Sequence, residues 1–167
     1  AFPETALGKA TAFVASTPQL FAYWMEIYEN QLNQLRTADQ ERCQRAGGDA
    51  NIHYLQSYCK LAPDEALLIE ADRIPEKGHW NLQISNFWME SLDYRHHRVH
   101  VNKYTAHYEE SGGVRIVLAH EDPGPAFPTS LETGGHDRGG MLFRWIESEG
   151  DNPPVRTSVV KLADLKR

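Results

Sequence analysis

The chain has 167 residues, 41% of them hydrophobic and 24% charged, which is typical of one folded domain of ordinary size and excludes a disordered chain. Its net charge of −6 argues against a dedicated nucleic-acid-binding protein, because such proteins usually present a basic face. No apolar run approaches the roughly 20 residues of a membrane span, and the first residues do not resemble a signal peptide, so we expect neither.

Residues 3–36 are expected to form two helices. Pro3 suits a first helical turn, and Thr17-Pro18 divides the run, with Pro18 at the start of the second helix. The second helix has a broad apolar face, made by Phe21, Trp24, Met25, Ile27, Tyr28, Leu32 and Leu35. We expect this face to cover the rest of the fold. The alternative is a contact with an upstream domain or a second copy of the chain, which would leave the face exposed in the isolated chain.

After a polar loop over residues 37–51, the chain changes to short stretches with strand character. Expected strands cover residues 53–61, 65–72, 79–88, 102–109, 113–121, 139–146 and 155–162. The turn at Ser111-Gly112 is the clearest hairpin. Helices followed by strands predict an α+β, mostly β chain, with a helical lead-in over residues 1–50 and an antiparallel β-sandwich over residues 51–167.

The stretch from residue 80 to residue 94 has the pattern of a binding site. It begins as a strand in which Trp80, Leu82 and Ile84 alternate with Asn81, Gln83 and Ser85, so that one face is apolar and the other carries neutral hydrogen-bonding groups. It continues with aromatic side chains among polar and acidic ones, at Asn86, Trp88, Glu90, Asp93 and Tyr94. We interpret the stretch as the floor and lip of a pocket.

The histidines do not predict a metal site. His96, His97 and His100 lie close in sequence, but adjacent side chains of an extended chain point to opposite faces, and two arginines in the same run repel a cation. No HExxH motif occurs. We therefore expect neither a metal ion nor a cofactor.

His120 ends an apolar strand face, where it is either a hydrogen-bonded core histidine or a general base oriented by Glu121 or Asp122. His136 and Arg138 lie between glycine pairs in the longest irregular stretch, residues 123–140, and loops of this length are often functional.

Arg144 alternates with Leu142 and Ile146, which places a guanidinium on an otherwise apolar strand face. A buried arginine needs a negative partner. Either one of Glu65, Glu90 and Asp93 supplies a structural ion pair, or Arg144 is an anchor for a ligand that bears a carboxylate.

The chain beyond residue 50 carries a dense set of short motifs. They are LAPDEAL (61–67), WNLQ (80–83), WMESLDYR (88–95), AHEDPG (119–124), GHDRG (135–139) and RW (144–145). Together they resemble the bacterial domain-of-unknown-function family numbered twelve-fourteen. The resemblance implies a jelly-roll-like β-sandwich, often at the C-terminal end of a longer protein and in some relatives behind a sandwich domain of the family numbered twelve-fifty-four. It implies no activity and no catalytic residues. Relatives commonly have Asn-Trp where this chain has Ala126-Phe127-Pro128, which puts a shared ligand specificity in doubt.

Two functions from different classes are compatible with these patterns. The first is a β-sandwich that binds a small polar or carbohydrate-like ligand or serves as an accessory domain. The alternative is a cofactor-independent hydrolase or lyase with a histidine–carboxylate pair. The candidate ligand-binding residues are Asn81, Gln83, Asn86, Trp88, Glu90, Asp93, Tyr94, His120, Asp122, His136, Arg138 and Arg144. Cys43 and Cys59 lack a metal-binding spacing and are expected to be free thiols in a reducing compartment such as the cytoplasm, a disulfide being the alternative.

Overall fold

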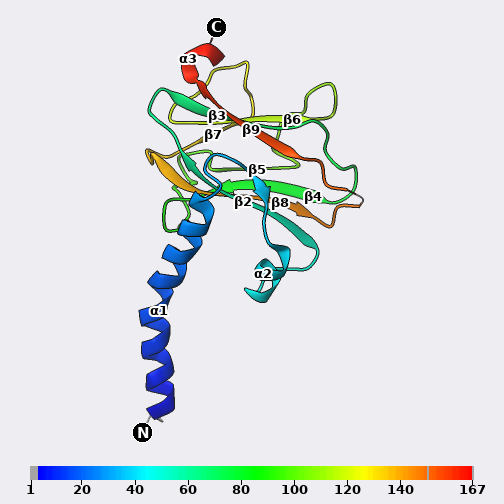
Figure 1. Cartoon of the computed structure of the whole chain (residues 1–167). Coiled ribbons are helices and arrows are strands. Elements are labelled where there is room, and N and C mark those ends of the chain that lie inside the picture. Colours follow the sequence, from blue (N-terminus) through cyan, green and yellow to red (C-terminus); the bar gives the residue numbers. More distant parts are fainter. Residues whose placement is uncertain (1–3, 150, 167) are drawn as a thin grey trace.

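The computed structural model describes residues 4–149 and 151–166, and Pro3, expected in a first helical turn, lies outside them. The chain is mostly β, as predicted (Figure 1). Its helices are α1 (Glu4–Glu29), α2 (Gln40–Arg45) and α3 (Leu162–Leu165). Its strands are β1 (Arg36–Thr37), β2 (Ile52–Lys60), β3 (Glu65–Ala71), β4 (His79–Ile84), β5 (His100–Asn102), β6 (Val114–Ala119), β7 (Ser130–Glu132), β8 (Arg138–Ile146) and β9 (Val155–Lys161).

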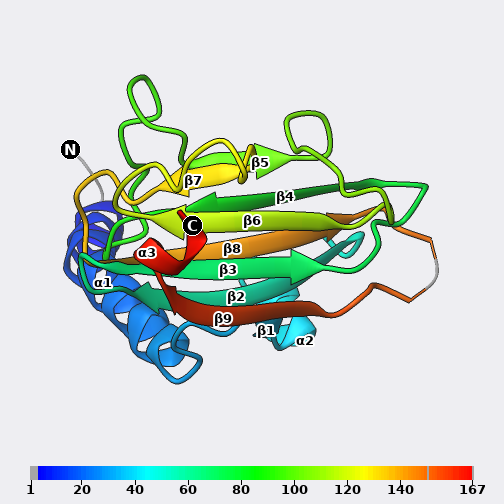
Figure 2. The same cartoon turned by 90° about the horizontal axis from the view of Figure 1, so that it is seen from above.

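The strands form two sheets. The first has the order β1-β2-β8-β4-β5 and the second the order β7-β6-β3-β9. All strand pairs in the described residues are antiparallel except β6 with β7, which is parallel, so the expected antiparallel arrangement holds everywhere but at this edge. The sheets lie one above the other, with α1 and α2 on the free side of the first sheet (Figures 1 and 2).

One hydrophobic cluster joins the inner faces of the two sheets. The first sheet contributes Trp80 and Phe143, whose rings stack with their centroids 5.5 Å apart, and Trp145 packs against Phe143 at 4.8 Å. The second sheet contributes Leu67 and Ile116, which are fully buried. The alternation of apolar and polar residues in β4 therefore sends every second side chain into this core, as predicted, and β8 contributes Met141, Phe143 and Trp145 in the same way.

Most expected strands are confirmed, and the differences have local causes. The strand expected over residues 79–88 ends at Ile84 because the Asn86 side chain accepts hydrogen bonds from the backbone of residues 88 and 90 and turns the chain. The strand expected over residues 102–109 is wrong. Asn102 accepts hydrogen bonds from the backbone of residues 104 and 105 and ends β5 there.

Other short elements were not foreseen. The hairpin expected at Ser111-Gly112 is a tight turn closed by a single bridge between Tyr108 and Val114, because no paired strand precedes it. The polar residues 37–51, expected as a loop, contain α2, which begins at the N-cap Asp39. The long loop over residues 123–140 contains β7.

The expected pair of N-terminal helices is one continuous helix, so the predicted break at Thr17-Pro18 is wrong (Figure 1). Pro18 cannot donate to the Val14 carbonyl. The Ser16 and Thr17 hydroxyls donate to the neighbouring Phe13 carbonyl at 3.3 and 2.7 Å, so this turn keeps side-chain hydrogen bonds where its backbone ladder is interrupted. The helix ends at Glu29 rather than near residue 36.

Among the described side chains of helix α1, the buried ones lie at its C-terminal end. Met25 and Tyr28 are buried against Tyr58 of β2, so the predicted apolar face covers the sheet there. The exposed apolar side chains lie further toward the N-terminus and include Phe13 and Val14, which are 70% and 71% exposed. Among the described residues, we find no helix with the length and apolar character that a bilayer crossing would need.

Both cysteines are buried free thiols. The Cys59 thiol donates to the Gly139 carbonyl at 3.3 Å, and burial raises the pKa of Cys59 to about 12. Cys43 lies on α2. The expectation of unpaired thiols is therefore confirmed.

Gly139 on β8 should tolerate no side chain. A Cβ built there would lie 1.9 Å from the Ser85 carbonyl oxygen, so the backbone would have to shift. We expect Gly139→Ala to lower the free energy of unfolding by about 2 kcal/mol or more, measured by urea denaturation. Gly8→Ala is the matched control, because it meets nothing within 4 Å on an exposed helix and should not lower stability. Equal stability of the two variants would contradict the close contact between β8 and residue 85.

Candidate functional site

The face of the first sheet that points away from the second sheet, called the outer face here, carries an ordered set of side chains. Strand β8 lies between β2 and β4, and the register aligns their outward residues in rows. The first row is Tyr54, Arg144 and Asn81, the second is Gln56, Leu142 and Gln83, and the third begins with Tyr58 and Gly140. Ser85 extends the third row through a hydrogen bond from its backbone N–H to the Gly140 carbonyl at 2.9 Å.

The C-terminal end of α1 covers part of these rows. Gly140 allows this close approach, since a Cβ there would lie 2.8 Å from the Ser85 hydroxyl and 3.8 Å from the Met25 methyl group. Trp24 of α1 contacts both Tyr28, with ring centroids 5.9 Å apart, and the Arg42 guanidinium of α2 at 5.7 Å. Helices α1 and α2 therefore meet above the sheet.

Two adjoining hollows remain between the helices and the outer face. The apolar hollow has a volume of about 250 Å³ and lies among Leu20, Phe21, Trp24, Tyr28, Cys43, Ala46, Gly48, Tyr54, Gln56, Met89 and Leu142. The polar hollow has a volume of about 120 Å³ and lies among Tyr28, Gln83, Ser85, Met89, Gly140, Met141, Leu142 and Arg144. The hollows share the wall formed by Tyr28, Met89 and Leu142.

Arg144 is the charged group of this site. It is half-buried, and its Nη1 donates to the Asn81 Oδ1 at 2.9 Å. In the part of the chain that the structure describes, no carboxylate forms an ion pair with it. Burial lowers the pKa of Arg144, while the nearby Tyr54 and Tyr28 oppose this shift. The site thus holds a guanidinium whose protein partner is a neutral amide.

The three carboxylates considered as partners of Arg144 are engaged elsewhere. Glu65 accepts from the Ala62 backbone at 2.9 Å and lies beside Lys161. Glu90 accepts from the Asn86 side chain at 2.6 Å. Asp93 accepts two hydrogen bonds from the Arg95 guanidinium, at 3.0 and 3.1 Å. The structural ion pair expected as one alternative for Arg144 is therefore not formed with any of them.

Tyr28 supplies a neutral hydroxyl at the shared wall. Burial raises the pKa of Tyr28 to about 12, although the charges of Arg42 and Arg144 act in the opposite direction. At neutral pH its hydroxyl is protonated and can donate or accept a hydrogen bond.

Of the twelve predicted residues, the structure brings Asn81, Gln83 and Arg144 together on the outer face. The chain after β4 holds Asn86, Trp88 and Glu90, but it contributes Ser85 and Met89 to the hollows. The φ of Met89 is 62°, which is unusual for this residue type. Trp88, Asp93 and Tyr94 line neither hollow. Trp88 and Tyr94 are 48% and 68% exposed.

The remaining predicted residues lie outside both hollows. His120 donates through Nε2 to the Leu61 carbonyl at 3.1 Å and accepts through Nδ1 from the Thr133 hydroxyl at 2.9 Å, so both ring nitrogens are used. Asp122 accepts from the Gly124 backbone at 2.9 Å. His136 is exposed, and Arg138 stacks over the Phe87 ring at 4.9 Å.

Several residues of the site were not predicted, namely Tyr28, Tyr54, Gln56, Met89 and Leu142. Tyr54 and Gln56 flank the buried Leu55, but His53 and Ser57 at the other alternating positions are polar, so the alternation in β2 is weak. The place of Met89 depends on a left-handed backbone conformation, which no pattern in the sequence indicates.

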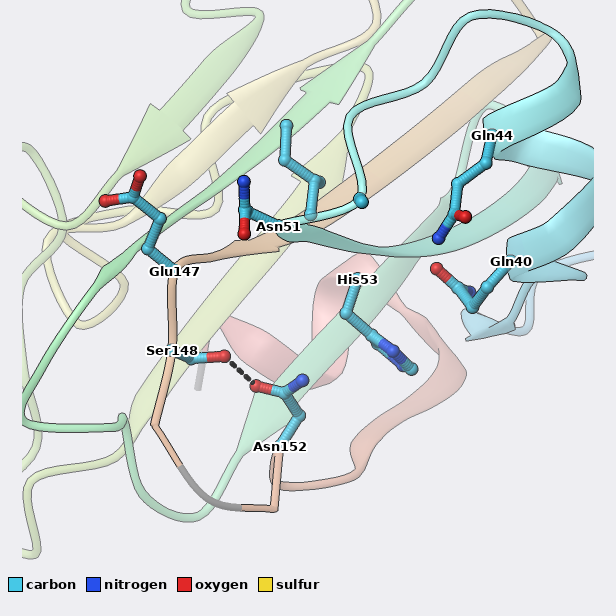
Figure 3. A pocket seen from close by; sticks show the side chains of 9 residues that line it. Gln40, Gln44, Asn51, His53, Glu147, Ser148 and Asn152 are labelled. Atoms are coloured by element: carbon cyan, nitrogen blue, oxygen red, sulfur yellow. Dashed lines mark hydrogen bonds between the residues drawn. The ribbon is translucent and has the colours of Figure 1, made fainter.

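A separate polar cavity of about 340 Å³ lies between α2, the start of β2 and the segment after β8 (Figure 3). The side-chain amide of Gln40 in its lining is already hydrogen-bonded. It donates to the carbonyls of residues 38 and 54 and accepts from the backbone N–H of residue 54. Ser148 donates to Asn152 at 2.5 Å. His53 and Glu147 point away from each other in Figure 3, and burial lowers the pKa of His53. This cavity therefore presents no cationic side chain and no assembled histidine–carboxylate pair.

Metal-ligating side chains do not gather in the described residues, where no group of three His, Cys, Asp or Glu side chains has a suitable arrangement.

No family model matches the chain, and no curated protein matches it. A solved structure of an uncharacterised protein from Burkholderia cenocepacia is similar to 87% of the chain, with 46% sequence identity and a TM-score of 0.82. The chain spans 39% of that protein's length. A second solved structure, of a protein from Vibrio parahaemolyticus, matches 65% of this chain and 31% of the length of that protein. Its sequence identity of 14% and TM-score of 0.48 are too low to support any inference.

Tyr58 allows a test of how the outer face is packed. Its hydroxyl is buried without a hydrogen-bond partner in the described residues, and burial raises the pKa of Tyr58 to about 12. Tyr58→Phe should therefore not lower the free energy of unfolding at pH 7.

The same variant should change the response to alkali. An unfolded tyrosine titrates near pH 10, roughly. Because the pKa of Tyr58 is higher in the folded state, the folded state is favoured by keeping this hydroxyl neutral. The stability that depends on the neutral hydroxyl is fully present below the unfolded pKa and is lost as the pH rises toward 12. The stability of Tyr58→Phe should fall less over this range, as followed by denaturant titration. A loss of more than about 1 kcal/mol at pH 7 would show that the hydroxyl has a partner.

Proposed function

We propose that this chain is a ligand-binding domain that takes up a small molecule through an anionic group held by Arg144 on the outer face. The observation that carries the proposal is the half-buried guanidinium, whose one hydrogen bond to a described residue goes to the neutral amide of Asn81. A desolvated cation without a counter-charge is costly, and a bound anion would remove that cost.

The surroundings of Arg144 support an anion. The lining of both hollows contains no acidic side chain, so a negative group meets no repulsion there. Gln83, Ser85 and Tyr28 add neutral hydrogen-bonding groups at the polar hollow. A forked guanidinium can donate to both oxygens of one carboxylate. A neutral sugar, the other ligand class considered from the sequence, would leave the positive charge unbalanced.

We further propose that the domain is a jelly-roll-like β-sandwich of the bacterial domain-of-unknown-function family numbered twelve-fourteen and that it serves as an accessory domain. The two stacked sheets with one shared core support the sandwich. The motifs between residues 61 and 145 support the family.

A hydrolase or lyase is the alternative function, and no observation favours it. It requires a histidine free to act as a base beside a carboxylate in a cleft. Both ring nitrogens of His120 already form hydrogen bonds. In the described residues, His97 contacts the carboxylate of Glu132 at 2.8 Å, but neither residue lines an outer-face hollow.

The experiment is a thermal-shift and calorimetric comparison of benzoate with benzamide, which differ mainly in charge. Benzoate should stabilise the protein and benzamide should not, because a ligand that binds the folded state raises the unfolding midpoint. Arg144→Gln should weaken benzoate binding about tenfold or more, since hydrogen bonds to charged groups contribute roughly 1.5–3 kcal/mol.

Arg73→Gln is the matched control for charge. Arg73 is exposed in the turn after β3, on the other sheet, so its loss should leave binding unchanged. Arg144→Gln should also fold with undiminished stability, because it removes a cation that has no ion pair in the described residues. A large loss of stability, or equal binding by wild type and Arg144→Gln, would refute the proposed function.

A further inference from the structure

The two outer-face hollows adjoin but differ in chemistry. The polar hollow contains Arg144, Gln83 and Ser85, whereas the apolar hollow is bounded by Leu20, Phe21 and Trp24 of α1. We propose that the ligand is an amphipathic monocarboxylate, with its carboxylate on Arg144 and an acyl or arylalkyl body in the apolar hollow. This inference rests on the proposed function and specifies its ligand class.

The geometry of the shared wall supports one continuous ligand. Tyr28, Met89 and Leu142 line both hollows, so a molecule that leaves the guanidinium along this wall enters the apolar hollow. Leu142 is the outward residue of β8 next to Arg144, two positions before it in the chain. Outward residues two apart on a strand are separated by about 7 Å, the length of a short alkyl chain.

The volume of the apolar hollow sets the size of the ligand body. An apolar cavity of roughly 150 Å³ is large enough to bind benzene. The 250 Å³ of the apolar hollow therefore suits a body somewhat larger than one aromatic ring. Leu20 at its rim is 51% exposed, so a bound apolar body would also remove exposed hydrophobic surface of the protein from water.

The charges select one carboxylate and no amine. Arg144 is the one cationic side chain that lines the hollows, and their lining includes no acidic residue. An amino acid would place its ammonium group without a carboxylate partner, and a dicarboxylate would bury its second charge among apolar side chains. Arg42 does not relieve this, because its guanidinium stacks on the Trp24 ring and is not part of the lining.

The test measures binding of one homologous series by calorimetry: acetate, butyrate, hexanoate and octanoate, with 4-phenylbutyrate as the aryl member. Affinity should rise by about fourfold for each methylene that enters the apolar hollow and then level off when it is filled. Octanamide, phenylalanine and suberate should each bind at least tenfold more weakly than octanoate, since each lacks the single uncompensated negative charge.

Leu142→Thr gives a matched variant, with Val159→Thr as its control. Leu142 lines both hollows, whereas Val159 is 42% exposed on β9 of the second sheet. Leu142→Thr should weaken octanoate binding severalfold more than it weakens acetate binding, and Val159→Thr should change neither.

The outcomes separate the two proposals. If the carboxylates bind with one affinity whatever their chain length, and Arg144→Gln abolishes that binding, the amphipathic ligand is refuted while the anion site stands. If octanamide binds as tightly as octanoate, or Arg144→Gln leaves octanoate binding unchanged, both proposals are refuted. Chain-length dependence that is lost in Leu142→Thr and kept in Val159→Thr supports the inference.

Discussion

The structure depends on the register of β8 between β2 and β4. That register places Trp145 opposite both His53 and Trp80, and Arg144 opposite both Tyr54 and Asn81. A shift of one residue would send Arg144 into the shared core and Trp145 to the outer face, which no part of the fold could accommodate. The alignment that builds the core therefore also positions the guanidinium.

The outer face illustrates how a stable core leaves room for function. Gly139 and Gly140 provide no side chain where residue 85 and α1 approach β8, and this contact brings the C-terminal end of α1 over the sheet. With the helix in this place, Trp24 borders the apolar hollow and Tyr28 borders both the apolar and the polar hollow. An arginine with an amide partner in such a space lowers the stability of the fold, as expected for the anion site that we propose.

Periodicity predicted much of this arrangement. Alternation in residues 80–85 identified the core side chains and the outward ones, including Asn81 and Gln83, and it placed Arg144 on one face of its strand with Leu142 and Ile146. It could not reveal that β8 lies between β4 and β2, because strand pairing joins residues far apart in sequence. For the same reason Tyr54 and Gln56 were not placed in the site. Local side-chain hydrogen bonds at Asn86 and Asn102 ended strands that propensity alone extended.

The most direct measurement is a crystal structure of the protein with 4-(4-bromophenyl)butyrate, in which anomalous scattering locates the bromine. We expect the carboxylate within hydrogen-bond distance of the Arg144 guanidinium and the bromine between Trp24 and Leu142. A ligand bound elsewhere, or Arg144 found in an ion pair with a carboxylate of the protein, would contradict it.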